Sequence, residues 1–361
     1  MTAYIVFLII IILEWLFMFP GAKVKVGQEI AYKQRKSFLI IVCIEMICFA
    51  GFRAIDIGAD TVIYLDALRY YSNFSNDNIL KAELVWPFKF ENGYFMLTKI
   101  AAWLSFDETT FLILIAILIY VPVCWFILQY SENPLLSILI YFAFFFGYSV
   151  GIFRQMIALS IVLIGTKYIW ERNFAKFLIT IGLAMTFHTT AIIMLPLYWV
   201  NNMKLDNKLT FIFVVEAIFL VSARAIALFA TRLSPMYSGY ISSKYDVQGG
   251  SYTMLILLNI VMIAGFIMER TKENRENQLL RMSVNAIVIA VFLQIVGYSM
   301  EIFGRVVPYY SIYLLVLVPF LLNRYFRKNI IFMHIIVVFA LVALFCFFTI
   351  GSKIDPYRFV F

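Results

Sequence analysis

The feature that most constrains this chain is a succession of apolar runs that continues almost from one end to the other. A membrane-spanning helix needs about 20 mostly apolar residues, and we place about 10–12 such helices in the sequence. Of the 361 residues, 63% are hydrophobic and only 14% are charged, whereas an ordinary soluble domain has roughly 25% charged residues. The sequence therefore predicts an all-α polytopic membrane protein that forms a single transmembrane domain, residues 1–361.

The basic residues indicate how the chain is oriented. The net charge is +8, and the lysines and arginines fall mainly in short loops between apolar runs. Such loops face the cytoplasm and contact anionic lipid head groups. The loop after the first run is the clearest case, with Lys23, Lys25, Lys33, Arg35 and Lys36. We therefore expect membrane lipids, and no nucleic acid, as partners of these residues.

Two longer polar segments, residues 53–108 and 231–251, are predicted to lie outside the cell. The first carries many carboxylates and aromatic residues, which favours an ordered cap with amphipathic helices at about residues 61–71 and 93–104. We expect both segments to form external loops that cover the outer ends of the transmembrane helices.

Residues 174–200 decide the topology of the second half. If this segment crosses the membrane once, the basic loops 270–281 and 323–328 fall outside, against the charge rule. If it enters and returns, both loops fall inside. We therefore predict a broken or re-entrant hairpin that turns near His188 and is ended by Pro196. Non-helical backbone at membrane depth is tolerated only where protein or water surrounds it, so the break marks a candidate site.

Arg154 and His188 each interrupt an apolar run. Charge at such a place is costly unless it faces a partner, a polar cavity or a substrate. The helical rise puts Arg154 about 24 Å above Trp170, and His188 about 21 Å above Phe174. We therefore predict that the two side chains lie at nearly the same depth on neighbouring antiparallel segments. The alternatives are an arginine that reaches the interface and a hydrogen-bonded core histidine.

Further polar residues are predicted on the outer face. Guanidinium groups bind phosphate oxygens bidentately, and a histidine or carboxylate can take a proton from an attacking hydroxyl. These residue types indicate an outer site for an anionic headgroup. Ordinary roles remain open, because Asp60 is also a natural helix N-cap and Arg305 can pair with Glu301. The candidates beside Arg154 and His188 are Arg53, Asp56, Asp60, Glu91, Arg232, Glu301 and Arg305.

Several short motifs follow one another along the chain. They are Arg53…Gly58-x-Asp60-Thr61-x-x-Tyr64, Glu91-x-Gly93-Tyr94, Phe153-Arg154-Gln155-x-Ile-Ala158, Ala184-x-x-Phe187-His188-Thr-Thr-Ala191 and Gly304-Arg305…Tyr309. In this order and spacing, over about residues 50–310, the chain resembles the EpsG-like polysaccharide polymerases. These are Wzy-type proteins of capsule and exopolysaccharide loci.

The resemblance implies a glycosyltransferase of GT-C-like polymerase/ligase architecture that needs no metal and no cofactor. Its substrate would be an undecaprenyl-diphosphate-linked oligosaccharide at the outer face of the bacterial cytoplasmic membrane. Its partners would include a flippase and a chain-length regulator. It also suggests His188, Arg154 and Asp60 as catalytic residues, and Arg53, Gln155, Arg305, Glu91, Tyr64 and Arg232 as substrate-binding residues.

Two other functions compete with the polymerase. A flippase for lipid-linked oligosaccharides would also be a basic polytopic bundle, but it should carry charges through the midplane on several helices and show internal halves. A ligase that moves finished polymer to another acceptor would share the arginines and the histidine. The sequence separates the ligase from the polymerase poorly.

Overall fold

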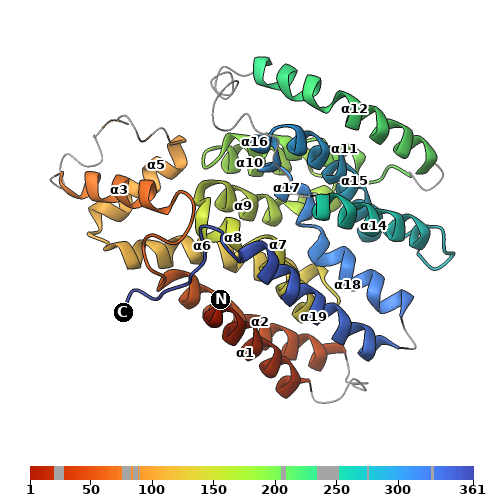
Figure 1. Cartoon of the computed structure of the whole chain (residues 1–361), viewed down its shortest axis with the longest axis horizontal. Coiled ribbons are helices and arrows are strands. Elements are labelled where there is room, and N and C mark those ends of the chain that lie inside the picture. Colours follow the sequence, from red (N-terminus) through yellow and green to blue (C-terminus); the bar gives the residue numbers. More distant parts are fainter. Residues whose placement is uncertain are drawn as a thin grey trace. The chain divides into compact units, whose positions relative to one another are not determined.

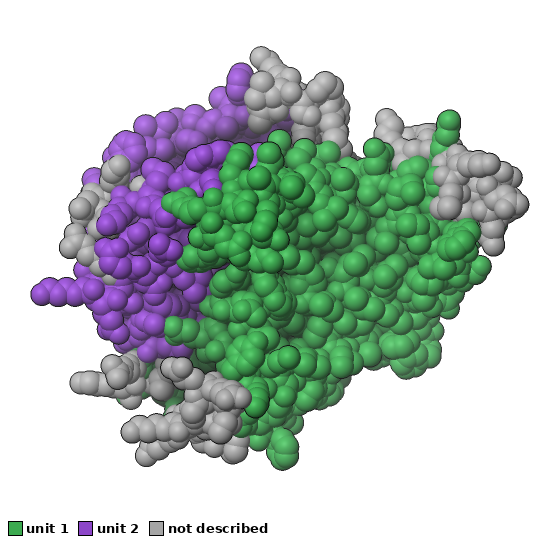
Figure 2. Space-filling model, turned by 180° about the vertical axis from the view of Figure 1, so that it is seen from behind, with its two compact units in different colours: residues 1–192, 326–361 green, residues 193–325 purple. Residues whose placement is uncertain are grey.

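The computed structural model describes residues 1–19, 28–74, 83, 88, 90–204, 209–233, 252–274, 276–326 and 329–361. Helices dominate this part of the chain, and none of its residues forms a named β-strand (Figure 1). The predicted all-α class is therefore confirmed. The chain divides into two compact units, residues 1–192 with 326–361 and residues 193–325 (Figure 2). The prediction of one transmembrane domain over residues 1–361 stays a prediction.

Unit 1 holds the N-terminal helices and the last helix of the chain. Its helices are α1 (Thr2–Met18), α2 (Gln28–Gly51), α3 (Thr61–Ser72), α5 (Asn92–Trp103), α6 (Glu108–Tyr130), α7 (Pro134–Phe144), α8 (Phe146–Gly151), α9 (Phe153–Trp170), α10 (Phe174–Met185) and α19 (Ile330–Thr349). The 3₁₀ helix η1 (Thr189–Met194) follows α10 along the chain.

Unit 2 is built around one deeply buried helix, α15, whose apolar surface packs against α12 and α14. The helices of this unit are α11 (Leu197–Val200), α12 (Leu209–Leu233), α14 (Tyr252–Glu269), α15 (Gln278–Ser299), α16 (Glu301–Gly304), α17 (Pro308–Ser311) and α18 (Leu314–Tyr325).

Five helical segments of the described chain are long and apolar enough to cross a membrane. They are Glu108–Tyr130, Leu209–Phe229, Tyr252–Glu269, Gln278–Ser299 and Ile331–Thr349. Shorter apolar helices, among them Thr2–Met18, Pro134–Phe144 and Phe174–Met185, lie where further spans were expected. These helices support a polytopic membrane protein.

One long apolar run of the sequence forms an interrupted helix. The run at about residues 135–152 forms two helices, α7 and α8, which are separated at Phe145. The Ser149 hydroxyl donates to the Phe145 carbonyl at 3.0 Å and pairs with the Tyr141 hydroxyl at 2.5 Å. Side-chain hydroxyls therefore help to satisfy the backbone at this break, as broken membrane helices require.

Helices α9 and α10 form a tight antiparallel hairpin. Arg172, in the turn, has a φ of 52°, and the Asn173 side chain caps α10 by accepting the Lys176 N–H at 3.0 Å. A Cβ atom at Gly165 would lie 2.7 Å from Thr180 Cγ2, so only a glycine allows the two helices to approach so closely. The hairpin brings the start of α9 and the end of α10 to the same side.

The predicted break near His188 is confirmed. Helix α10 ends at Met185, and the chain continues as the 3₁₀ helix η1 and, after Pro196, as the short helix α11. Whether the second part returns to the side from which α10 came stays a prediction.

The predicted external loop 231–251 starts later than expected, because α12 continues to Leu233. Residues 234–251 lie outside the described part of the chain, as do 75–82, 84–87 and 89 of the predicted loop 53–108.

Candidate active site

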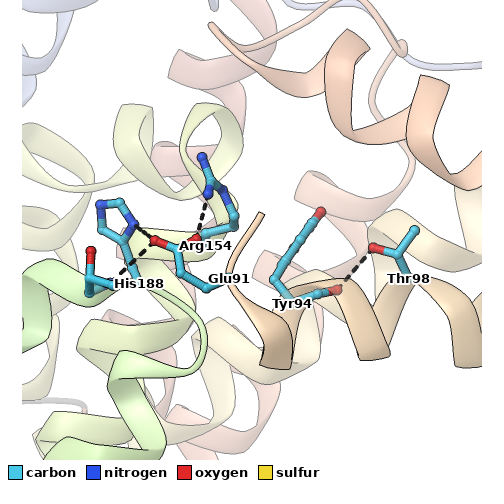
Figure 3. A network of polar contacts seen from close by, with 6 residues as sticks. Glu91, Tyr94, Thr98, Arg154 and His188 are labelled. Carbon is cyan, nitrogen blue, oxygen red and sulfur yellow. Dashed lines mark hydrogen bonds and ion pairs between the residues drawn. The ribbon is translucent and has the colours of Figure 1, made fainter. Parts of the chain in front are cut away.

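Three ionisable side chains of unit 1 meet at the open end of the α9–α10 hairpin (Figure 3). Glu91 Oε2 lies 2.5 Å from Arg154 Nη1, and Glu91 Oε1 lies 2.9 Å from His188 Nδ1. The side chains of Glu91, Arg154 and His188 are 11%, 18% and 16% exposed, so the cluster is largely shielded from solvent yet reachable from the surface. The predicted proximity of Arg154 and His188 is confirmed, and Glu91 joins them.

The helical hairpin places both of these basic residues. Arg154 is the second residue of α9, directly after the break at Ile152. His188 lies in the break after α10, where its backbone N–H donates to the Ala184 carbonyl at 3.0 Å. Because the two helices are antiparallel, the first turn of one and the last turn of the other meet at one place.

Glu91 comes from a different part of the chain and is the N-cap residue of α5. Its backbone is extended (φ −67°, ψ 151°), and its side chain does not cap the helix that it precedes. Instead, Oε1 also accepts the backbone N–H of Thr189 at 3.3 Å. The guanidinium of Arg154 lies over the rings of Phe90 and Tyr64, at 5.0 and 5.9 Å from their centroids.

A glycine makes this approach of α5 to α10 possible. The N–H of Gly93 donates to the Thr186 carbonyl at 2.7 Å. A Cβ atom at position 93 would lie 2.4 Å from Thr186 Oγ1 and 2.8 Å from the Thr186 carbonyl oxygen, closer than real side chains come. The motif Glu91-x-Gly93 therefore has a geometric reason: the glycine seats the helix, and the glutamate two residues earlier reaches the cluster.

The environment of Glu91 keeps its carboxyl group ionised. Burial by itself raises the pKa of this carboxyl, but the hydrogen bond from His188 and the charges of Arg154 and His188 lower it more, to about 2. At neutral pH the group is therefore a carboxylate, which only accepts hydrogen bonds.

An ionised Glu91 fixes the orientation of the histidine. Because the carboxylate accepts, His188 Nδ1 must carry the hydrogen that points to it. In the neutral imidazole the other nitrogen, Nε2, is then the proton acceptor. Such a carboxylate–histidine pair is the arrangement that orients a general base in many hydrolases and transferases.

A second group of motif residues holds the start of α9. The buried guanidinium of Arg53 donates to the carbonyl oxygens of Ala50, Ile57 and Val150, the last at 3.1 Å. The Thr61 hydroxyl also bonds to the Val150 carbonyl, at 3.0 Å.

The turn between Arg53 and Thr61 packs on the carbonyl group of Val150. Gly58 has a φ of +108°, and a Cβ atom there would lie 2.1 Å from the Val150 oxygen. The backbone N–H of Asp60 donates to the Gly151 carbonyl at 3.1 Å. These contacts close the C-terminal end of α8 and fix the break from which α9 and Arg154 begin. We call Arg53, Gly58 and Thr61 the Val150 clamp.

The remaining predicted residues of unit 1 lie near the cluster in different roles. Tyr64 is buried and stacks on Phe153, with ring centroids 4.7 Å apart. Gln155 is buried in the first turn of α9. Asp60 precedes α3 as its N-cap residue, without a side-chain capping bond.

Arg305 and Arg232 belong to unit 2. Arg305 follows the short helix α16. The backbone of Arg232 lies in the last turn of α12, and its side chain lies outside the described part of the structure. Within the described residues, no group of three or more histidine, cysteine or carboxylate side chains is arranged to hold a metal ion.

The fold and the site together indicate the class of protein. It is an all-α membrane protein in which a glutamate links an arginine and a histidine at a helix break. The EpsG family model matches residues 36–359, nearly the whole chain. The protein therefore belongs to the EpsG family, a family of Wzy-like polymerases of exopolysaccharide biosynthesis. No curated protein and no solved structure gives a significant match.

Proposed function

We propose that the protein polymerises oligosaccharide repeat units at the outer face of the bacterial cytoplasmic membrane. It transfers the growing glycan from undecaprenyl diphosphate to a hydroxyl of the next undecaprenyl-diphosphate-linked repeat, without a metal ion. The observation that carries the proposal is the single carboxylate of Glu91, which binds Arg154 and His188 at 2.5 and 2.9 Å. It unites a phosphate-binding cation and a proton acceptor in one cluster.

Arg154 binds the donor diphosphate. A guanidinium group has N–H donors on two edges, so it can hold a carboxylate and phosphate oxygens together. Glu91 keeps the guanidinium in place through Nη1. When the bond between the anomeric carbon and the diphosphate breaks, negative charge develops on the leaving oxygen, and the positive charge of Arg154 stabilises it.

His188 acts on the acceptor sugar. Its Nε2 takes the proton of the acceptor hydroxyl while the hydroxyl oxygen forms the new bond to the anomeric carbon. The displaced undecaprenyl diphosphate leaves with the bonding electrons, and the proton on His188 passes to water or to the departing phosphate. Glu91 stabilises the positive charge that His188 carries in between.

The other candidate residues receive supporting roles. Gln155 and Tyr64 support Arg154, and Asp60 is an alternative proton acceptor. Arg305 binds the second headgroup, and Arg53 shapes the cap through the Val150 clamp. A flippase supplies the lipid-linked repeats, and a chain-length regulator limits the product.

Incubation of the purified protein with lipid-linked repeat units, without metal ions or nucleotide sugars, tests the proposal. We expect a ladder of products on a gel. Arg154→Ala and His188→Ala should leave single repeats on their lipid, whereas Lys272→Ala, a matched change at an exposed loop residue, should give the normal ladder. A normal ladder from well-folded Arg154→Ala protein would remove the assignment.

The same assay separates the competing functions. A flippase would move a labelled lipid-linked repeat across a vesicle membrane and form no ladder. A ligase would need preformed polymer and a second acceptor, and its inactive variants would keep polymer on the lipid carrier.

A further inference from the structure

Helix α5, which carries Glu91 at its N-terminus, exposes a continuous apolar stripe. Met96, Ile100, Trp103 and Leu104 are 44%, 43%, 44% and 50% exposed, and their spacing places them on one face of the helix. We call these residues the α5 stripe. The opposite face of α5 is buried and includes Tyr94 and Thr98, which are drawn in Figure 3.

The exposed surface of the neighbouring helix α3 is mixed, because Val62, Ile63 and Tyr70 are exposed together with charged side chains. There Arg69 forms ion pairs with Asp66 at 2.8 Å and with Glu108 at 2.5 Å. In α5 the one charged side chain, Lys99, is turned inward and is 3% exposed, over the ring of Phe95. Helix α5 has 12 residues and is too short to cross a bilayer. The exposed apolar face of α5 is therefore not the lipid-facing side of a membrane-spanning helix.

One end of the α5 stripe lies toward the candidate active site, and the other lies toward the start of helix α6. Met96 lies one helical turn after Gly93 on the same side of α5, and the N–H of Gly93 donates to the carbonyl of Thr186, two residues before His188, at 2.7 Å. Leu104 lies four residues before Glu108, where the membrane-spanning helix α6 begins, and four residues reach at most about 14 Å. The stripe itself extends about 12 Å from Met96 to Leu104. It thus joins the candidate active site to the edge of the membrane.

We propose that the α5 stripe binds the hydrocarbon chain of the lipid-linked substrate. This inference rests on the proposed function, because it takes the diphosphate to lie at Arg154. A lipid whose phosphates are bound there must keep its first isoprene units out of water on the way to the bilayer. The α5 stripe supplies an apolar surface along that path, and contact between them removes both from water.

Substrates of different chain length test the proposal. Lipid-linked repeats are compared on a full-length polyprenyl chain and on a short, water-soluble chain of two isoprene units. Ile100→Asn should raise the KM for the long-chain substrate about tenfold, with kcat retained, because one apolar contact is worth roughly that factor. The KM for the short-chain substrate should not change. Met96→Ser is a second variant, in case Ile100→Asn does not fold.

Ile63→Asn is the matched control, because Ile63 is a 37% exposed isoleucine on α3 outside the stripe. It should leave both KM values unchanged. If Ile100→Asn and Met96→Ser raise the KM of both substrates equally, or of neither, the stripe does not bind the chain.

A binding experiment separates this inference from the proposed function. If the wild-type protein turns over neither substrate, the proposed function fails, and a photoreactive polyprenyl phosphate in phosphatidylglycerol vesicles then tests the stripe directly. Labelling of α5 that unlabelled polyprenyl phosphate suppresses supports the inference. Equal labelling by a photoreactive phospholipid would mean that the stripe faces ordinary membrane lipid and would overturn it, as would no labelling of α5.

Discussion

At the scale of single residues, Glu91 joins Arg154 and His188 in one cluster. Without this carboxylate, a guanidinium and an imidazole would each lie near a helix end with no common partner, which is costly in a membrane protein. With it, the arginine and the histidine are held 2.5 and 2.9 Å from the same group. A substitution at Glu91 should therefore affect both.

The lowered pKa of Glu91 makes a prediction about stability and pH. Its pKa falls from the usual 4.5 to about 2 in the folded protein. The unfolded chain therefore binds the proton more readily, and the stabilisation by Glu91 is complete above about pH 4.5 and lost as the pH falls toward 2. The shift corresponds to a contribution on the order of 3 kcal/mol.

Thermal unfolding in detergent from about pH 6 to about pH 2 measures this effect. Wild-type protein should lose stability through that window more steeply than Glu91→Gln, which has no group to titrate there. Glu83→Gln, at an exposed glutamate, should follow the wild type. Parallel curves for wild type and Glu91→Gln would show that the carboxylate is not held as described.

At this scale the sequence predicted part of the site. Helix lengths placed Arg154 and His188 together, because both lie on regular segments joined by a short turn. The linking role of Glu91 could not be predicted, since it lies 63 residues from Arg154 and 97 from His188. A single extended residue before a short helix has no periodic pattern that reveals its partner.

At the scale of elements, the contact between α5 and the end of α10 depends on Gly93. Gly93→Ala would put a methyl group 2.4 Å from Thr186 Oγ1 and should force the two elements apart. We expect a loss of about 1–3 kcal/mol in stability and a drop in polymerisation of more than about tenfold. Unfolding midpoints and initial rates of ladder formation measure the two effects.

Gly182→Ala is the control for this change, because a Cβ atom at that position of α10 meets nothing within 4 Å. It should leave activity and stability as they are or raise stability slightly, since alanine favours a helix. If Gly93→Ala behaved in the same way, the close approach of α5 would not matter.

The Val150 clamp makes a different prediction for Arg53. Arg53→Met removes the donors to the carbonyls of Ala50, Ile57 and Val150. We expect a loss of about 2–4 kcal/mol in stability, with the KM unchanged in the fraction that stays folded, because the guanidinium is buried and donates to backbone carbonyls. A stable Arg53→Met variant with a raised KM would show instead that Arg53 contacts the headgroup.

The elements themselves followed from the sequence more completely than the contacts between them. Apolar runs predict where the helices lie, and the break near His188 followed from counting loop charges. The division of the run 135–152 at Phe145 could not be foreseen. At this break the hydroxyls of Ser149 and Tyr141 pair, a contact that no hydrophobic pattern signals.

At the scale of the whole molecule, the charge pattern predicts which side faces outward. With cysteines introduced at two exposed charged positions, Asp66→Cys should react with a membrane-impermeant maleimide in intact cells. Lys272→Cys should react only after the cells are opened, because its basic loop is predicted to lie inside. Protein without the introduced cysteine gives the background. The reverse labelling pattern would contradict an outward-facing site.

The central claim, that Glu91 and His188 act as one unit in polymerisation, is tested most directly by a double-mutant cycle. Initial rates of ladder formation are measured for wild type, Glu91→Gln, His188→Ala and the double variant. We predict that each single change lowers the rate at least about a hundredfold and that the double variant is no slower than the slower single one by more than about threefold. Losses that multiply in the double variant, or single variants with normal rates, would contradict the account.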